Sequence, residues 1–170
     1  MTTVSAMALL TASVGCATDL HRRRIPNVLT FGSAVTALVF HAVRGGVPDL
    51  TAAAGGLLIA GGIFFLPFAL GGMGAGDVKL LGALGAWFGP ANALSLVACT
   101  AIAGMVLAFV VACRYGYLRQ AVANLWLILS HWYLVGVRPV DGLTLARSPG
   151  PKLAYAVPIL LGTVATVWRD

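Results

Sequence analysis

Long apolar stretches, separated by short charged or glycine-rich connections, dominate this sequence. A membrane-crossing helix needs about 20 apolar residues, or somewhat fewer if it stands upright. Of the 170 residues, 59% are hydrophobic and only 9% are charged, which is too little charge to cover a soluble domain of this length. The apolar stretches lie at about residues 3–18, 28–43, 52–70, 78–88, 91–112 and 153–168. We therefore expect an all-α polytopic membrane protein of about six transmembrane helices, forming one membrane-embedded domain over residues 1–170 with no soluble domain.

The stretch at residues 78–88 is short for a full crossing. It either stands upright and packs closely through Gly85 and Gly89, or lies partly sunk among neighbouring helices. Pro26 precedes the second stretch and is expected in the first turn of its helix, where proline is well tolerated.

Residues 120–137 could be counted as a further span, and the distribution of positive charge decides against it. If this stretch lies on the cytoplasmic interface, nine Lys and Arg residues are inside and two are outside; as a seventh span it changes the ratio to seven against four. The inside set is Arg22, Arg23, Arg24, Lys79, Arg114, Arg119, Arg138, Arg147 and Lys152. Because positive residues favour the cytoplasmic side, we expect a cytoplasmic interfacial helix before the last span and the N-terminus outside.

The net charge of +6 is explained by these topology signals beside anionic lipid headgroups, so we expect no nucleic acid partner. Cys16, Cys99 and Cys113 are scattered singly through apolar stretches, and no Cys-x-x-Cys pair occurs. We therefore expect no metal site and no cofactor, and interpret the cysteines as small buried apolar residues.

Two of the five acidic residues lie at the ends of apolar spans on the same membrane face. Asp19 ends the first span and Asp77 follows the third, so an even number of crossings lies between them. The positive charge makes that face cytoplasmic. Asp49 and Asp170 fall on the opposite face, and Asp141 lies in a polar loop on the same face.

Two carboxyl groups at the edge of a bilayer are suited to peptide hydrolysis. One ionised Asp takes a proton from water while a protonated Asp donates to the scissile carbonyl. Two like charges held together in a low dielectric titrate apart, so that the pair shares one proton. This chemistry requires no metal and no covalent intermediate.

The residues around Asp77 fit such a role. Gly74 and Gly76 allow a tight turn and a close approach of the backbone, and Asp77 begins the next helix, where the helix dipole favours its ionised form. The simpler interpretation is that Asp77 only caps a helix and that Asp19 is solvated among the headgroups.

Two sequence segments favour the catalytic interpretation, because they are similar to segments of a known protein family. Residues 19–30 read Asp-Leu-His-Arg-Arg-Arg-Ile-Pro-Asn-Val-Leu-Thr, and residues 74–82 read Gly-Ala-Gly-Asp-Val-Lys-Leu-Leu-Gly. Together, in this order and in so apolar a chain, they resemble the two signature segments of the type IV prepilin peptidase family. The resemblance implies that Asp19 and Asp77 are the catalytic aspartates. It implies that the supporting motif positions are Gly74, Gly76, Lys79, Pro26 and Asn27.

The resemblance also implies a substrate and a location. The substrate would be a prepilin precursor, with a basic leader and an apolar helix in the same bilayer, cleaved at the cytoplasmic face of the bacterial inner membrane. Longer family members carry paired cysteines near their start and also methylate the product. This chain begins with its first span, so it resembles the short, cleavage-only form of tight-adherence (Flp-type) pilus systems, and we expect no N-methylation.

Three alternatives remain open at this point. A presenilin-like or signal-peptide-peptidase-like enzyme also pairs an Asp with Gly-x-Gly-Asp, but buries both within more helices, whereas Asp19 adjoins three arginines. A small transporter or proton pathway would use the same carboxylates, and predicts acids at mid-span depth. A structural membrane subunit without chemistry is the third.

Overall fold

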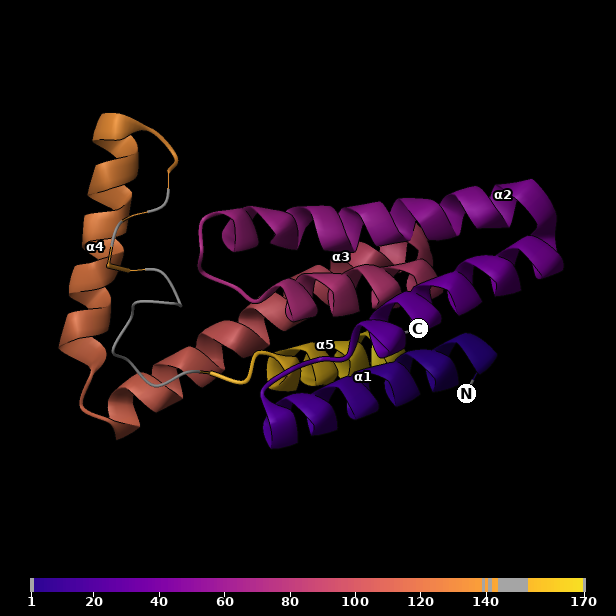
Figure 1. Ribbon diagram of the computed structural model, residues 1–170, viewed down its shortest axis with the longest axis horizontal. Helices are drawn as coiled ribbons and strands as arrows, with labels where there is room; N and C mark the ends of the chain where they lie inside the picture. Colours follow the sequence, from indigo (N-terminus) through magenta and orange to yellow (C-terminus); the bar gives the residue numbers. More distant parts are fainter. Residues whose placement is uncertain (1, 139, 141, 144–152, 170) are drawn as a thin grey trace.

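The computed structural model describes residues 2–138, 140, 142–143 and 153–169, and over these residues the chain is all-α (Figure 1). The five helices are α1 (Thr3–Arg22), α2 (Asn27–Ala69), α3 (Ala75–Arg114), α4 (Leu118–Val135) and α5 (Ala156–Arg169). The all-α expectation is confirmed. Three of these helices, α1, α2 and α3, contain an apolar stretch long enough to cross a membrane.

Helices α2 and α3 each reverse direction at a glycine. Gly46 has φ 66° and ψ −149°, and Gly89 has φ 72° and ψ 178°. A positive φ is readily adopted only by glycine, and a proline follows each break closely, at Pro48 and Pro90. In Figure 1 the two arms of each helix run back alongside one another. Each break lies in the short connection between two of the apolar stretches found in the sequence.

The first arm of α3, residues 75–88, is the centre of the bundle. Every residue from Leu80 to Phe88 is buried, and α3 packs against α1, α2 and α5. Leu80, Leu81 and Leu84 have no exposed surface. The short stretch is therefore sunk among its neighbours, which was one of the two arrangements expected for it.

Close backbone packing joins this arm to the second arm of α2, residues 47–69. A Cβ atom on Gly56 would overlap the carbonyl oxygen of Gly85 and come within 2.9 Å of the Cα of Gly89. A Cβ on Gly85 would in turn overlap the carbonyl oxygen of Gly56. Small residues allow helix backbones in membranes to approach this closely, and Gly85 and Gly89 both take part as expected.

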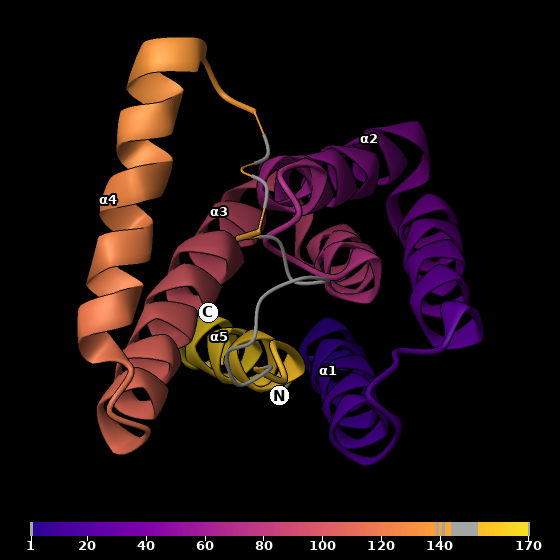
Figure 2. The same cartoon turned by 60° about the vertical axis from the view of Figure 1, so that its left-hand side comes forward.

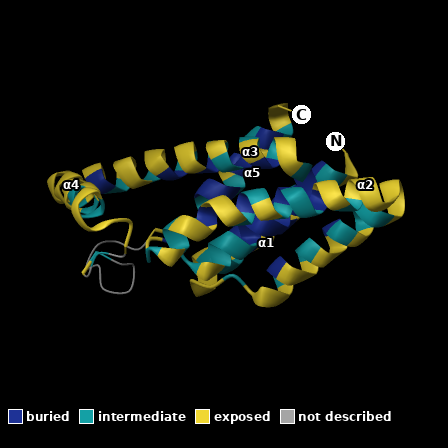
Figure 3. Ribbon diagram, turned by 90° about the horizontal axis from the view of Figure 1, so that it is seen from above, coloured by how far each residue is buried: buried dark blue, intermediate teal, exposed yellow. Residues whose placement is uncertain are grey.

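Large apolar side chains cover the outer surface of the bundle. Val28 is 86% exposed, Val43 81% and Trp168 91%. Figure 3 shows exposed residues along the outward faces of the helices, with the buried residues facing inward. So large an apolar exposure suits a lipid environment and not water.

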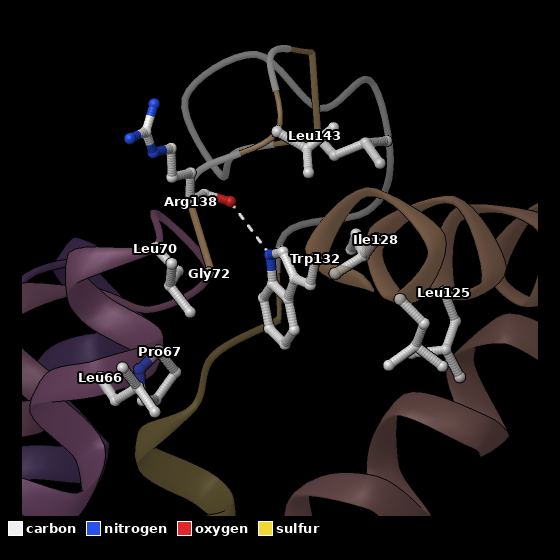
Figure 4. Close-up of a pocket in the computed structure, with 11 residues that line it drawn as sticks. Leu66, Pro67, Leu70, Gly72, Leu125, Ile128, Trp132, Arg138 and Leu143 are labelled. Carbon is white, nitrogen blue, oxygen red and sulfur yellow. Dashed lines mark hydrogen bonds between the residues drawn. The ribbon is translucent and has the colours of Figure 1, made fainter. Parts of the chain in front are cut away.

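Helix α4 stands away from the bundle, as Figures 1 and 2 show. None of its residues, all of which the structure describes, is buried. An apolar hollow of about 290 Å³ separates it from the end of α2, between Leu66 and Pro67 on one side and Ile128 and Trp132 on the other (Figure 4). Trp132 Nε1 donates a hydrogen bond of 3.0 Å to the Arg138 carbonyl at its border.

Some expectations need correction. Helix α1 does not end at Asp19 but continues for almost one more turn to Arg22. Pro26 is the N-cap of α2, with φ −63° and ψ 135°, so it lies just before the first helical turn and not in it. Cys16 is buried as expected, whereas Cys113 is exposed. Asp141, Asp170 and most of the 138–152 loop lie outside the described residues.

Candidate active site

The two motif segments meet at one end of the bundle and line a common hollow of about 320 Å³. The first segment contributes Asp19 from α1 and Asn27 from the start of α2, and the second contributes Asp77 from the first turn of α3. The rest of the lining comes from Arg23, Arg24, Ile25, Gly74, Ala75 and Gly76. Helices that are distant in sequence thus bring the two aspartates to one place.

Local helix geometry fixes the Asp77 side chain. Gly74 is the N-cap of α3, so Asp77 is the third residue of the helix. Its carboxylate folds back and accepts a hydrogen bond from the Gly74 backbone N–H. An acidic side chain at this position commonly caps a helix in this way. A Cβ on Gly74 would lie 2.9 Å from Asp77 Oδ2, so a larger residue at position 74 would displace the carboxylate from this position.

The second motif glycine serves a different contact. A Cβ on Gly76 would lie 3.2 Å from the Cβ of Ile25, in the connection between α1 and α2. This connection therefore packs directly on the first turn of α3. Gly74 leaves room for the Asp77 carboxylate, and Gly76 leaves room for the segment that follows Asp19.

The other aspartate is held where α1 ends. Asp19 is half-buried, and its carbonyl oxygen accepts a 2.8 Å hydrogen bond from the backbone N–H of Arg23. Arg23 has φ 54° and ψ 30°, the left-handed conformation that commonly closes a helix. The chain turns there and leads over Ile25 into Pro26 and α2.

A side-chain contact joins the two segments directly. Lys79 Nζ donates a hydrogen bond of 2.9 Å to Asn27 Oδ1, and it lies 5.1 Å from the centre of the Phe31 ring. Both partners of Lys79 belong to the first turns of α2. The two motif residues are 52 positions apart in the sequence.

The electrostatics of the hollow favour a proton on one carboxyl group. Asp77 precedes the apolar stretch of α3, which begins at Val78. Burial raises the pKa of the Asp77 carboxyl from its ordinary value of 3.8 to about 7; the negative charge of Asp19 also raises it, and the hydrogen bond from Gly74 opposes both effects. The two carboxyl groups therefore interact, and Asp77 holds its proton far more tightly than an isolated aspartate.

Sequence reasoning missed the positions of Arg23 and Arg24. It treated them only as topology signals, yet both line the hollow beside the aspartates. A run of three arginines does not reveal that one of them has a left-handed backbone conformation. No group of three or more His, Cys, Asp or Glu residues within the described ranges could hold a metal ion.

Comparison with known proteins identifies the family. The sequence profile of the Type IV leader peptidase family matches residues 6–109, which is more than half of the chain. The chain belongs to this family. The match contains both motif segments and the whole lining of the hollow, and stops before the end of α3. No curated protein and no solved structure matches the chain significantly.

Type IV leader peptidases are aspartic peptidases that cleave the leaders of prepilins. This chain is accordingly a hydrolase with prepilin substrates. The long apolar helices and the family together indicate the inner membrane.

Proposed function

We propose that this chain is a membrane aspartyl endopeptidase in which Asp19 and Asp77 together activate water. The observation that carries the proposal is their common hollow: two acidic residues from separate motifs line it and interact through their charges. The capping contact of Asp77 and the left-handed turn at Arg23 hold the backbones of both sides in defined positions.

In the proposed mechanism, Asp19 is the general base and Asp77 the general acid. Ionised Asp19 takes a proton from a water molecule, whose oxygen attacks the scissile carbonyl carbon while Asp77 gives its proton to the carbonyl oxygen. The tetrahedral intermediate then collapses: one of its hydroxyl protons returns to Asp77 as the carbonyl forms again, the C–N bond breaks, and the proton held by Asp19 passes to the leaving nitrogen. The raised pKa of Asp77 supports this assignment of the proton.

We also propose a topology of six crossings with the hollow on the cytoplasmic side. The crossings would be the apolar parts of α1, of the two arms of α2, of the two arms of α3 and of α5, with the N-terminus outside and Asp19 and Asp77 at the cytoplasmic border. Support comes from the reversals at Gly46 and Gly89 and from the bias of Lys and Arg residues. A reporter that is active only outside the cytoplasm should be active when fused at residues 46 and 89. A reporter that is active only in the cytoplasm should be active when fused at residues 24 and 72.

Helix α4 would lie along the cytoplasmic interface. Its residues are all at least partly exposed, and its aromatic side chains Trp126 and Tyr133, 73% and 89% exposed, are suited to the headgroup region.

The proposed substrate is a Flp-type prepilin, with a basic leader followed by an apolar helix. This choice depends on the resemblance to the short, cleavage-only members of the family, which lack the paired cysteines of the longer members; no Cys-x-x-Cys pair occurs in this sequence. Cleavage of a co-expressed Flp-type prepilin should exceed that of a prepilin from another type IV system, and the product should carry an unmethylated N-terminus. Equal cleavage of both precursors would contradict the substrate assignment.

The deciding experiment compares prepilin processing by the wild type and by Asp19→Asn and Asp77→Asn. Asparagine keeps the shape of the side chain and removes the acid. Asp49→Asn and Asp141→Asn are the controls, because Asp49 follows the turn at Gly46 at the other end of α2's first arm and Asp141 belongs to neither motif segment. With equal amounts in the membrane, both motif variants should lose processing and both controls should keep it. Normal processing by either motif variant would rule out the dyad.

A further inference from the structure

A lateral groove of about 420 Å³ runs between α1 and the first arm of α2. Its walls are α1 from Met7 to Val14 and α2 from Val28 to Thr36, and buried Trp87 of α3 lies between them. Each wall extends for about 10 Å along its helix, at 1.5 Å per residue, which corresponds to two helical turns.

Hydrogen bonds join the two walls at the floor of the groove, and the walls separate towards its opening. Thr11 and Ser33 share a hydrogen bond of 2.9 Å, and Trp87 Nε1 donates to Ser33 Oγ at 2.9 Å. These polar groups are therefore paired with one another. Above them the groove presents apolar side chains: Leu10 is 57% exposed and Val28 86% exposed.

The groove leads into the catalytic hollow. Asn27 lines the hollow and Val28, the next residue, lines the groove. On the other wall, the helix that ends with Val14 in the groove continues to Asp19 in the hollow. A helix lying along the groove would thus have one end directed towards the hollow that Asp19 and Asp77 line.

Small residues make room for a helix on the α2 side. Gly32 and Thr36 are one turn apart and line the same wall. A Cβ on Gly32 would meet no described atom within 4 Å, so the space in front of it is open. Helices in membranes approach most closely at such small residues.

We propose that this groove receives the apolar helix of the prepilin substrate and so places the leader junction at the hollow. The inference rests on the proposed function. A polypeptide inside the bilayer must satisfy its backbone hydrogen bonds internally, so the substrate is helical until it leaves the hydrocarbon region. The groove is lined mainly by apolar side chains, with its polar groups paired at Thr11 and Ser33, and one of its ends adjoins the hollow of the two aspartates. At that end the helix must give way to an extended, cleavable segment.

The test is Gly32→Leu, with Gly62→Leu as the matched control. Both glycines lie exposed on α2, and for both an added Cβ meets no described atom within 4 Å, but Gly62 is on the second arm and does not line the groove. Overfilling a packed site costs enough to slow prepilin cleavage about tenfold or more in Gly32→Leu. Gly62→Leu should cleave at the wild-type rate, and both variants should reach the wild-type level in the membrane.

The outcomes separate the groove from the proposed function. If the wild type cleaves the prepilin and Gly32→Leu cleaves it equally fast, the groove assignment is wrong and the peptidase assignment stands. If the wild type does not cleave the prepilin at all, the proposed substrate is wrong and the groove assignment falls with it.

A photo-reactive benzophenone residue at Thr36 gives an independent readout in an Asp77→Asn background, where substrate is not consumed. It should capture the prepilin, whereas the same group at Ile63, which is 46% exposed on the second arm, should not. Capture of lipid alone, or of a second copy of this chain, from Thr36 would overturn the proposal.

Discussion

Lys79 Nζ donates a 2.9 Å hydrogen bond to Asn27 Oδ1 and thereby connects the second turn of α3 to the first turn of α2. Asn27 lines the hollow that contains Asp19 and Asp77, and Lys79 follows Asp77 by two positions. The contact therefore links the backbones that carry the two sides of the candidate site. We therefore propose a positioning role for Lys79, a motif residue without an evident chemical task.

Lys79→Met and Asn27→Ala should each slow prepilin cleavage, and the double variant should be no slower than the worse single variant. Residues that act through one contact show coupling energies of about 0.5–3 kcal/mol in a double-mutant cycle. The measurements are the cleavage rate at saturating substrate and the dependence of that rate on substrate concentration. Arg44→Met is the control, because Arg44 lies 5.4 Å over the Phe40 ring, away from the aspartates. Strictly additive losses would contradict the coupling.

Prepilin cleavage should decline as the pH rises through about 7. The proposed mechanism needs a proton on Asp77, and the raised pKa of that carboxyl means that the proton is lost around pH 7. Initial rates in detergent across this range would report the decline. In Asp19→Asn the pKa of Asp77 should fall, because one cause of its elevation is removed; the carboxylic-acid infrared band would follow the titration.

The same group makes stability depend on pH. Because the pKa of Asp77 is higher in the folded chain than its ordinary value of 3.8, the folded state binds the proton more tightly than the unfolded state. The stabilisation is complete below pH 3.8 and is lost as the pH rises towards 7. Thermal unfolding in detergent should show this decrease for the wild type and a weaker one for Asp77→Asn. Identical pH profiles would refute the burial of this carboxyl.

Gly74→Ala and Gly76→Ala should both impair cleavage for separate reasons. The first places a methyl group 2.9 Å from Asp77 Oδ2, and the second places one 3.2 Å from the Ile25 Cβ. Gly72→Ala, whose Cβ would be 3.4 Å from the Pro67 carbonyl oxygen, is a milder change in the same loop. We expect a loss of rate of about tenfold or more for the two motif variants, as for other overpacked sites. Wild-type rates in both would contradict the geometry of the loop.

Gly56→Ala should destabilise the fold, whereas Gly55→Ala should not. A Cβ on Gly56 overlaps the Gly85 carbonyl oxygen, so the two arms must separate; overpacking of this kind costs about 1–3 kcal/mol or more. The nearest described atom to a Cβ on Gly55 is the Pro90 Cβ at 4.0 Å, and alanine is the better helix former. The midpoints of thermal unfolding in detergent should therefore move in opposite directions. A stable Gly56→Ala variant would contradict the close contact.

Patterns confined to one segment predicted the structure well. Apolar stretches located the helices, and the two motifs named residues that do line one hollow. The glycines at positions 46 and 89 separate arms that the hydropathy pattern had already separated. Such features depend on local composition and on backbone conformation, both of which can be read from neighbouring residues.

Relations between distant segments could not be predicted in this way. Nothing in the sequence pairs Lys79 with Asn27, or brings Ile25 onto Gly76, because these contacts depend on how three helices pack. The same holds for Arg23 and Arg24. Their charge led to a prediction of membrane topology, whereas their place in the lining of the hollow depends on the left-handed turn at Arg23. The chain also departs from expectation where α1 continues beyond Asp19, since a helix end depends on its cap and not on hydropathy alone.

The arm of α3 that begins beside Asp77 is enclosed by protein from Leu80 to Phe88. The glycine contacts with α2 fix where this arm, and with it Asp77, lies relative to the neighbouring helices. We therefore expect the position at which a substrate is cut to depend on this packing and to stay the same in bilayers of different thickness.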